Sequence, residues 1–116
     1  MKVMIVDDSA AIRRMIRSML LTTVDSICEC SDGSEALESY EHFHPDWVLM
    51  DIKMKEMDGF QATEAILSEF PDARIIMITQ YNDPKLEEKA KRIGACEFVL
   101  KERLVDIEGI ILDNHN

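Results

Sequence analysis

The sequence predicts an α/β domain in which helices cover both faces of a parallel sheet. Short apolar runs rich in β-branched residues alternate with longer segments whose apolar residues recur at helical spacing. The short runs lack a polar face, as is typical of strands buried on both sides. The length of 116 residues fits one domain, and we therefore expect residues 1–116 to form a single unit.

Ten elements follow from this alternation, five strands and five helices. The expected order is strand 3–6, helix 11–20, strand 24–30, helix 33–43, strand 47–50, helix 60–70, strand 75–78, helix 84–93, strand 98–100 and helix 104–112. Ser9 is a favourable N-cap for the first helix, and Pro45 separates the second helix from the third strand.

Local signals delimit the second half of the chain in the same way. Asp58 and Gly59 form a turn signal before the third helix. Pro84 suits the first turn of the fourth helix, and Gly94 suits its C-terminal cap. Gly109 weakens the last helix.

Parallel strands of this kind are joined by right-handed crossovers. Known flavodoxin-like, doubly wound sheets have the strand order 2-1-3-4-5, and their ligands bind beyond the carboxyl ends of the strands, where the strand order reverses. We adopt that order for the five expected strands. It makes the first and third strands neighbours at the reversal point.

Polar residues occupy those carboxyl ends. Asp7 and Asp8 follow the first strand, Asp51 the third, Thr79 the fourth and Lys101 the fifth. In the adopted order the three carboxylates converge. Two unit charges about 4 Å apart repel by about 4 kcal/mol at an effective dielectric of 20. The carboxylates must therefore bind a cation, bind protons or spread apart.

This set of groups suits phosphoryl transfer. Oxygen ligands supplied by few residues suit Mg²⁺, which keeps several waters. Lys101 can neutralise a further charge, and Thr79 offers a hydroxyl to an anionic oxygen. A central carboxylate at Asp51 could then form an aspartyl phosphate. Each residue alone is more often a cap, turn or solvated residue, so the prediction depends on their joint placement.

The same residues resemble the receiver domains of bacterial two-component response regulators, including the chemotaxis regulators. The matching motifs cover 3–9, 49–59, 76–79 and 94–101. The resemblance implies that Asp51 accepts a phosphoryl group from a phosphohistidine on a sensor histidine kinase or phosphotransfer domain. It also implies that Asp8, Asp51 and the backbone carbonyl of Lys53 ligate Mg²⁺, with Asp7 acting mainly through water.

The resemblance further implies a conformational switch. Thr79 and Lys101 would contact the phosphoryl oxygens, and Phe98 matches the aromatic that turns inward on activation. The face of the fourth helix, fifth strand and fifth helix would then bind a downstream protein or an attached output domain. Such a protein catalyses only its own phosphorylation and dephosphorylation. Gln80 and Glu102 depart from the family, which usually has a small residue and a proline there.

Composition narrows the location and the partners. The net charge of −10 argues against direct binding to nucleic acid. No apolar run approaches the roughly 18 residues of a membrane span. Three cysteines without a signal peptide indicate a reduced, cytoplasmic protein.

Three alternatives to a stand-alone receiver differ in what they require. The chain stops shortly after the last expected helix, which favours a minimal domain, but a receiver cut from a larger DNA-binding regulator is a close alternative. A Mg²⁺-dependent phosphatase with an aspartyl nucleophile generally needs an acid two residues later, and that residue is Lys53. The complete set of acids argues against a pseudo-receiver that acts only by docking.

Overall fold

Five parallel strands form one sheet in the computed structural model, which describes residues 1–113. The strands are β1 (Lys2–Val6), β2 (Ser26–Cys30), β3 (Trp47–Asp51), β4 (Ile75–Thr79) and β5 (Glu97–Leu100). Their order is β2-β1-β3-β4-β5, and every neighbouring pair is parallel. The predicted fold class and strand order are therefore confirmed.

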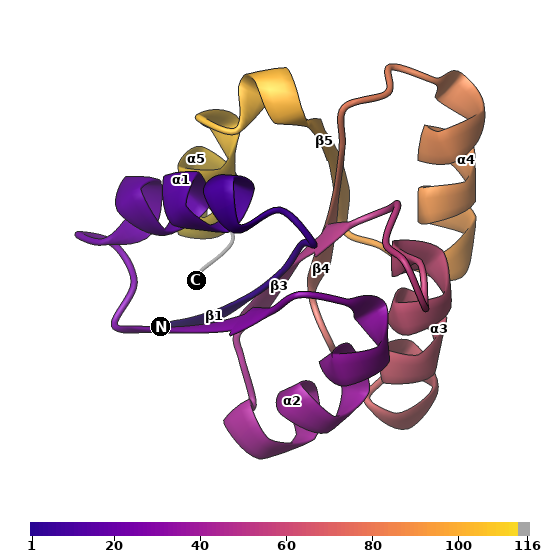
Figure 1. Cartoon of the computed structure of the whole chain (residues 1–116), viewed down its shortest axis with the longest axis horizontal. Coiled ribbons are helices and arrows are strands. Elements are labelled where there is room, and N and C mark those ends of the chain that lie inside the picture. Colours follow the sequence, from indigo (N-terminus) through magenta and orange to yellow (C-terminus); the bar gives the residue numbers. More distant parts are fainter. Residues whose placement is uncertain (114–116) are drawn as a thin grey trace.

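Helices cover both faces of this sheet, as Figure 1 shows. They are α1 (Ala10–Leu20), α2 (Ala36–Phe43), α3 (Gly59–Glu69), α4 (Pro84–Ile93) and α5 (Asp106–Asp113), with 3₁₀ turns at Gly33–Glu35 and Lys101–Arg103. Helices α1 and α5 pack on one face, and α2, α3 and α4 pack on the other. None of the helices within 1–113 has the length and apolar character needed to cross a bilayer.

Successive side chains along a strand point to opposite faces of the sheet, so each strand contributes residues to both hydrophobic cores. On β1, Val3 and Ile5 belong to the core beneath α1 and α5, while Met4 and Val6 belong to the other core. All four side chains are completely buried. This double burial is why the strands lack a polar face in the sequence.

Three expected boundaries were wrong by two or three residues. Helix α2 begins at Ala36 rather than at residue 33, because Gly33–Glu35 form a 3₁₀ turn. Strand β2 begins at Ser26 rather than at residue 24, because Thr23 and Val24 donate backbone hydrogen bonds to Leu20 O and extend the end of α1. The last helix begins at Asp106 rather than at residue 104, because Leu104 and Val105 form a turn after the 3₁₀ segment Lys101–Arg103. Leu104 is nevertheless buried in the core.

The predicted caps lie where the sequence placed them. The Ser9 hydroxyl accepts a hydrogen bond of 3.2 Å from Ile12 N at the start of α1. Gly94 ends α4 with a φ of 107°, a left-handed conformation that favours glycine. The Ser9 cap fixes the start of α1 directly after Asp7 and Asp8.

Candidate functional site

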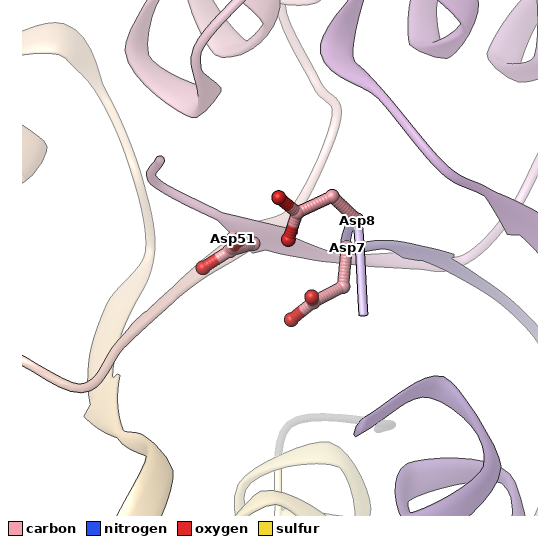
Figure 2. A group of neighbouring side chains, drawn as sticks. All are labelled: Asp7, Asp8 and Asp51. Atoms are coloured by element: carbon pink, nitrogen blue, oxygen red, sulfur yellow. The ribbon is translucent and has the colours of Figure 1, made fainter. Parts of the chain in front are cut away.

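Three carboxylates meet at the carboxyl ends of β1 and β3. The two strands pair in parallel, with Val6 opposite Met50, so Asp7, Asp8 and Asp51 follow at the same edge. Each offers an oxygen within 4.8 Å of the other two, and Figure 2 shows the three side chains gathered there. Asp7 is 1% exposed and Asp51 5%, whereas Asp8 lies at the surface.

Lys101 is the counter-charge of this group. Its Nζ lies 3.1 Å from Asp7 Oδ2 and 3.2 Å from Asp51 Oδ1. Ser9 N donates a 2.8 Å hydrogen bond to the other oxygen of Asp7. Asp7 Oδ2 is buried, and its partner among the described residues is the ammonium of Lys101. One ammonium thus faces two buried carboxylates.

The pKa values of Asp51 and Lys101 reflect this excess of carboxylates over ammonium groups. Burial, and next the charge of Asp7, raise the pKa of Asp51 to about 6, although Lys101 acts in the opposite direction. Burial acts to lower the pKa of Lys101, but the Asp51 and Asp7 carboxylates outweigh it and raise that pKa. Lys101 therefore stays charged, while Asp51 holds a proton more readily than an ordinary carboxylic acid does.

The donor set fits a hard divalent cation. It consists of carboxylate oxygens, and one of them, Asp7 Oδ2, is buried with no hydrogen-bond donor aligned on it. A cation there would offset the mutual repulsion of the acids. Few protein ligands and one exposed acid suit Mg²⁺, which keeps part of its water shell.

A cavity of about 320 Å³ opens beside Asp51. Its wall includes Thr79, which is 2% exposed, and the surface residues Gln80 and Tyr81. Tyr81 N donates a 3.1 Å hydrogen bond to Thr79 Oγ1. Because the hydroxyl oxygen is the acceptor in that bond, the hydroxyl proton remains available for an anionic oxygen in the cavity.

The sequence did not predict two contacts around this cavity. Lys53 Nζ lies 4.3 Å from the centre of the Tyr81 ring, which joins the loops after β3 and β4. Arg13 Nη1 donates a 2.6 Å hydrogen bond to the carbonyl of Asp7, and its Nε donates to Glu29. Neither Arg13 nor its partners were identified from the sequence, because Glu29 lies 16 residues away on another element.

Gly59 closes the loop that follows Asp51. Gly59 N donates a 2.7 Å hydrogen bond to Ile52 O. A Cβ on Gly59 would lie 2.0 Å from the carbonyl oxygen of Asp51, closer than any side chain permits. The turn signal in the sequence is therefore also a site of close approach between backbones.

The expected switch aromatic, Phe98, is not among the residues lining the acidic cavity. It lies on β5 opposite Met77, is half-buried, and packs against the core beneath α2, α3 and α4. It also lines a second cavity of about 390 Å³, together with residues of β5 and α5 and with Glu87 of α4. This places Phe98 on the expected output face.

Comparisons with known proteins agree with this geometry. A family model described as the response regulator receiver domain matches residues 3–110. Chemotaxis protein CheY of Bacillus subtilis is 37% identical over 101 residues, which cover 86% of this chain and 84% of that protein. The uncharacterized transcriptional regulatory protein YhcZ of the same organism is 38% identical over 104 residues, but the chain spans only 49% of its length.

Solved structures agree as well. Chemotaxis protein CheY4 of Vibrio cholerae is 28% identical, with a TM-score of 0.83 and coverage of 95% of this chain and 97% of that one. The CheX-CheY-BeF₃-Mg²⁺ complex from Borrelia burgdorferi matches at 25% identity, with a TM-score of 0.86 and coverage of 97% and 87%.

Proposed function

This chain belongs to the response regulator receiver domain family of two-component signalling, and we propose that it is a switch in which Asp51 accepts the phosphoryl group. The observation that supports this choice is the position of Asp51 among Asp7, Asp8 and Lys101. It ends β3 at the edge of an open cavity, with one carboxylate oxygen 3.2 Å from the ammonium of Lys101.

The proposed reaction is a direct transfer. A carboxylate oxygen of Asp51 forms a bond to phosphorus while the bond from phosphorus to the imidazole nitrogen of a phosphohistidine breaks. The imidazole leaves with that electron pair. Lys101 and the Thr79 hydroxyl then contact the phosphoryl oxygens, because both groups border the cavity and can neutralise or hydrogen-bond an anion.

Mg²⁺, when bound by Asp8, Asp51 and the Lys53 carbonyl with Asp7 acting mainly through water, would neutralise charge on the transferred group. Among the described residues, Lys101 is the cation that forms an ion pair with Asp51. A bound cation also favours the ionised form of Asp51, which is the form that reacts. The Borrelia CheY complex, which contains Mg²⁺ and BeF₃, is consistent with such a site.

The proposed partners follow from the same reaction. The donor is a sensor histidine kinase or a phosphotransfer domain, and the output is a downstream protein or an attached domain. A receiver within a larger DNA-binding regulator is the second candidate, favoured by the match to half of YhcZ. In such a regulator the other domain would bind DNA, because the net charge of −10 on the receiver repels the phosphate backbone. We do not propose phosphatase activity on external substrates, because Lys53 replaces the acid that it needs.

Incubation with acetyl phosphate and Mg²⁺ tests the proposal, with intact mass as the measurement. The wild-type protein should gain the mass of one phosphoryl group, and Asp51→Asn should gain none. A gain that persists in Asp51→Asn and maps to another acid by borohydride trapping would contradict the assignment. Asp8→Ala should abolish Mg²⁺ binding in a calorimetric titration, and equal affinity in that variant would contradict the metal site.

A further inference from the structure

Asp32 joins two loops that are distant in sequence. It follows β2 and lies outside the three acids of the site. Its carboxylate accepts hydrogen bonds from three backbone N–H groups: Ser34 N at 2.9 Å, Glu56 N at 3.1 Å and Met57 N at 3.2 Å. The first caps its own turn. The other two come from the loop between β3 and α3.

The neighbouring glycine tightens this junction. A Cβ on Gly33 would lie 2.3 Å from the carbonyl oxygen of Met57, so the two backbones touch where a side chain would keep them apart. The loop is thus fixed at two places. Asp32 and Gly33 hold its distal part, while the hydrogen bond from Gly59 to Ile52 closes its base.

The negative charge of Asp32 strengthens the hydrogen bonds that hold the loop. Burial acts to raise its pKa, but the hydrogen bonds from Ser34, Glu56 and Met57 outweigh it and lower the pKa to about 2. The carboxylate is therefore ionised at any pH at which the protein would work, and its hydrogen bonds are charge-assisted.

We propose that Asp32 is a positioning residue for the Mg²⁺ site, because it clamps the loop that carries Lys53. The inference deepens the proposed function, since the metal ligand expected from Lys53 is its backbone carbonyl. A backbone ligand cannot be oriented by a rotamer and depends on the loop itself. A loop that is already ordered loses less conformational entropy when the metal binds than a mobile one does.

Asp32→Asn tests the clamp with little change in shape. Asparagine keeps one carbonyl oxygen, which can still cap Ser34, but its NH₂ group would face a backbone N–H. Calorimetric titration with Mg²⁺ should give a dissociation constant about tenfold higher than that of the wild type, the size typical for the loss of a group that orients a ligand. Amide hydrogen exchange should also accelerate in the metal-free protein at Glu56, whose N–H would face the NH₂ group.

Asp46→Asn is the matched control. Asp46 directly precedes β3, and its Oδ2 accepts a 2.7 Å hydrogen bond from Lys2 N at the start of β1. That place is at the opposite end of the sheet from the acidic site. The control should bind Mg²⁺ as the wild type does. If Asp32→Asn folds poorly, Asp32→Ser keeps an N-cap residue that is too short to reach both Glu56 and Met57, and the same loss of affinity is expected.

The outcomes separate the clamp from the proposed function. Wild-type affinity in both Asp32 variants, with normal phosphorylation of Asp51, would overturn the clamp and leave the function intact. Equal losses in the Asp32 and Asp46 variants would attribute the effect to general stability and would also overturn it. Failure of the wild type to bind Mg²⁺ would overturn the metal site and the clamp together.

Discussion

Asp51 is buried beside Asp7, and in the metal-free protein its charge is stabilised less than it is in the unfolded chain. The raised pKa, about 6 against 3.8, means that the folded state binds a proton at Asp51 more tightly than the unfolded state does. Its contribution to stability is therefore greatest below the unfolded pKa and is lost as the pH rises through the folded pKa. The proposed phospho-acceptor therefore weakens the fold of the metal-free protein at neutral pH.

Asp51→Asn should accordingly stabilise the metal-free protein at neutral pH. A difference of about two pKa units corresponds to about 3 kcal/mol, the upper limit of the gain at pH 7 and above. The gain should shrink as the pH falls through 6 and vanish below about 4, where both states of the wild type are protonated at Asp51. Urea unfolding of both proteins from pH 4 to 8, with a chelator present, measures it.

Two results would argue against this account. A difference between the two proteins that stays constant with pH would show that Asp51 does not titrate as proposed. Saturating Mg²⁺ should raise the unfolding free energy of the wild type more than that of Asp51→Asn, because only the wild type supplies the full set of acids. Equal stabilisation of both would contradict the role of Asp51 in binding the metal.

In helix α1, fewer apolar side chains are buried than the apolar spacing in the sequence predicts. The apolar residues between Ala11 and Leu20 cover about half of the helix circumference at 100° per residue. Of these residues, Ile16 and Leu20 are the fully buried ones. Ile12 lines the acidic cavity, and Met15 is 51% exposed one turn further along. An exposed apolar side chain on the helix that borders this cavity is a candidate contact for the phosphoryl donor.

Met15→Lys should slow phosphoryl transfer from the cognate kinase by about tenfold, the effect of losing about 1.4 kcal/mol of contact energy. Labelling by acetyl phosphate should stay unchanged, because that small donor does not touch α1. The control is Leu21→Lys, since Leu21 is 63% exposed at the far end of the helix. Equal losses with both donors would indicate misfolding rather than docking.

The sequence predicted the elements well because each carries its own local signals. Burial on both faces, caps and turn residues depend on near neighbours, so all ten elements and the polar residues at four strand ends were found. The clamp at Asp32 escaped prediction because its partners Glu56 and Met57 lie 24 and 25 residues away. The capping box of Asp58 and Gln61 at the start of α3 was detectable, but only the turn at Gly59 was noted.

Closeness in the sequence was also a poor guide to distance from the acidic site. Trp47 is four residues from Asp51, but it begins β3 while Asp51 ends it. Its ring is buried, with the guanidinium of Arg74 at 4.5 Å. Trp47 therefore lies at the opposite edge of the sheet from the acids, and titration calorimetry remains the better monitor of Mg²⁺ binding.

At the scale of the whole molecule, β4 links the acidic cavity to the α4–β5–α5 face, because its last residue lines the cavity and its neighbour in the sheet is β5. Thr79 is the last residue of β4 and pairs with Leu100, while Phe98 pairs with Met77 two residues earlier. The face itself is mixed in charge. Four of the thirteen lysines and arginines lie on α4, namely Lys85, Lys89, Lys91 and Arg92. An acidic partner would complement them.

Phosphorylation of Asp51 adds about −1.5 to −2 charges at the edge of the sheet. Lys101 and Thr79 are the groups placed to follow that charge, and a movement of Thr79 opens space behind it. Phe98 is half-buried beside the cavity of about 390 Å³ on the output face, so it has room to move. We expect phosphorylation to change amide shifts chiefly at Thr79, at Phe98 and along α4.

Phe98→Ala should therefore break the coupling between phosphorylation of Asp51 and the response of α4. The variant should accept a phosphoryl group from acetyl phosphate as the wild type does, while the shift changes along α4 largely disappear. Phe43→Ala is the matched control, because Phe43 is also a partly buried aromatic of the same core but ends α2, near Lys2 at the other end of the sheet. It should retain the wild-type shifts. Wild-type shifts along α4 in Phe98→Ala would exclude the aromatic as the coupling element, because the signal would then reach α4 without it.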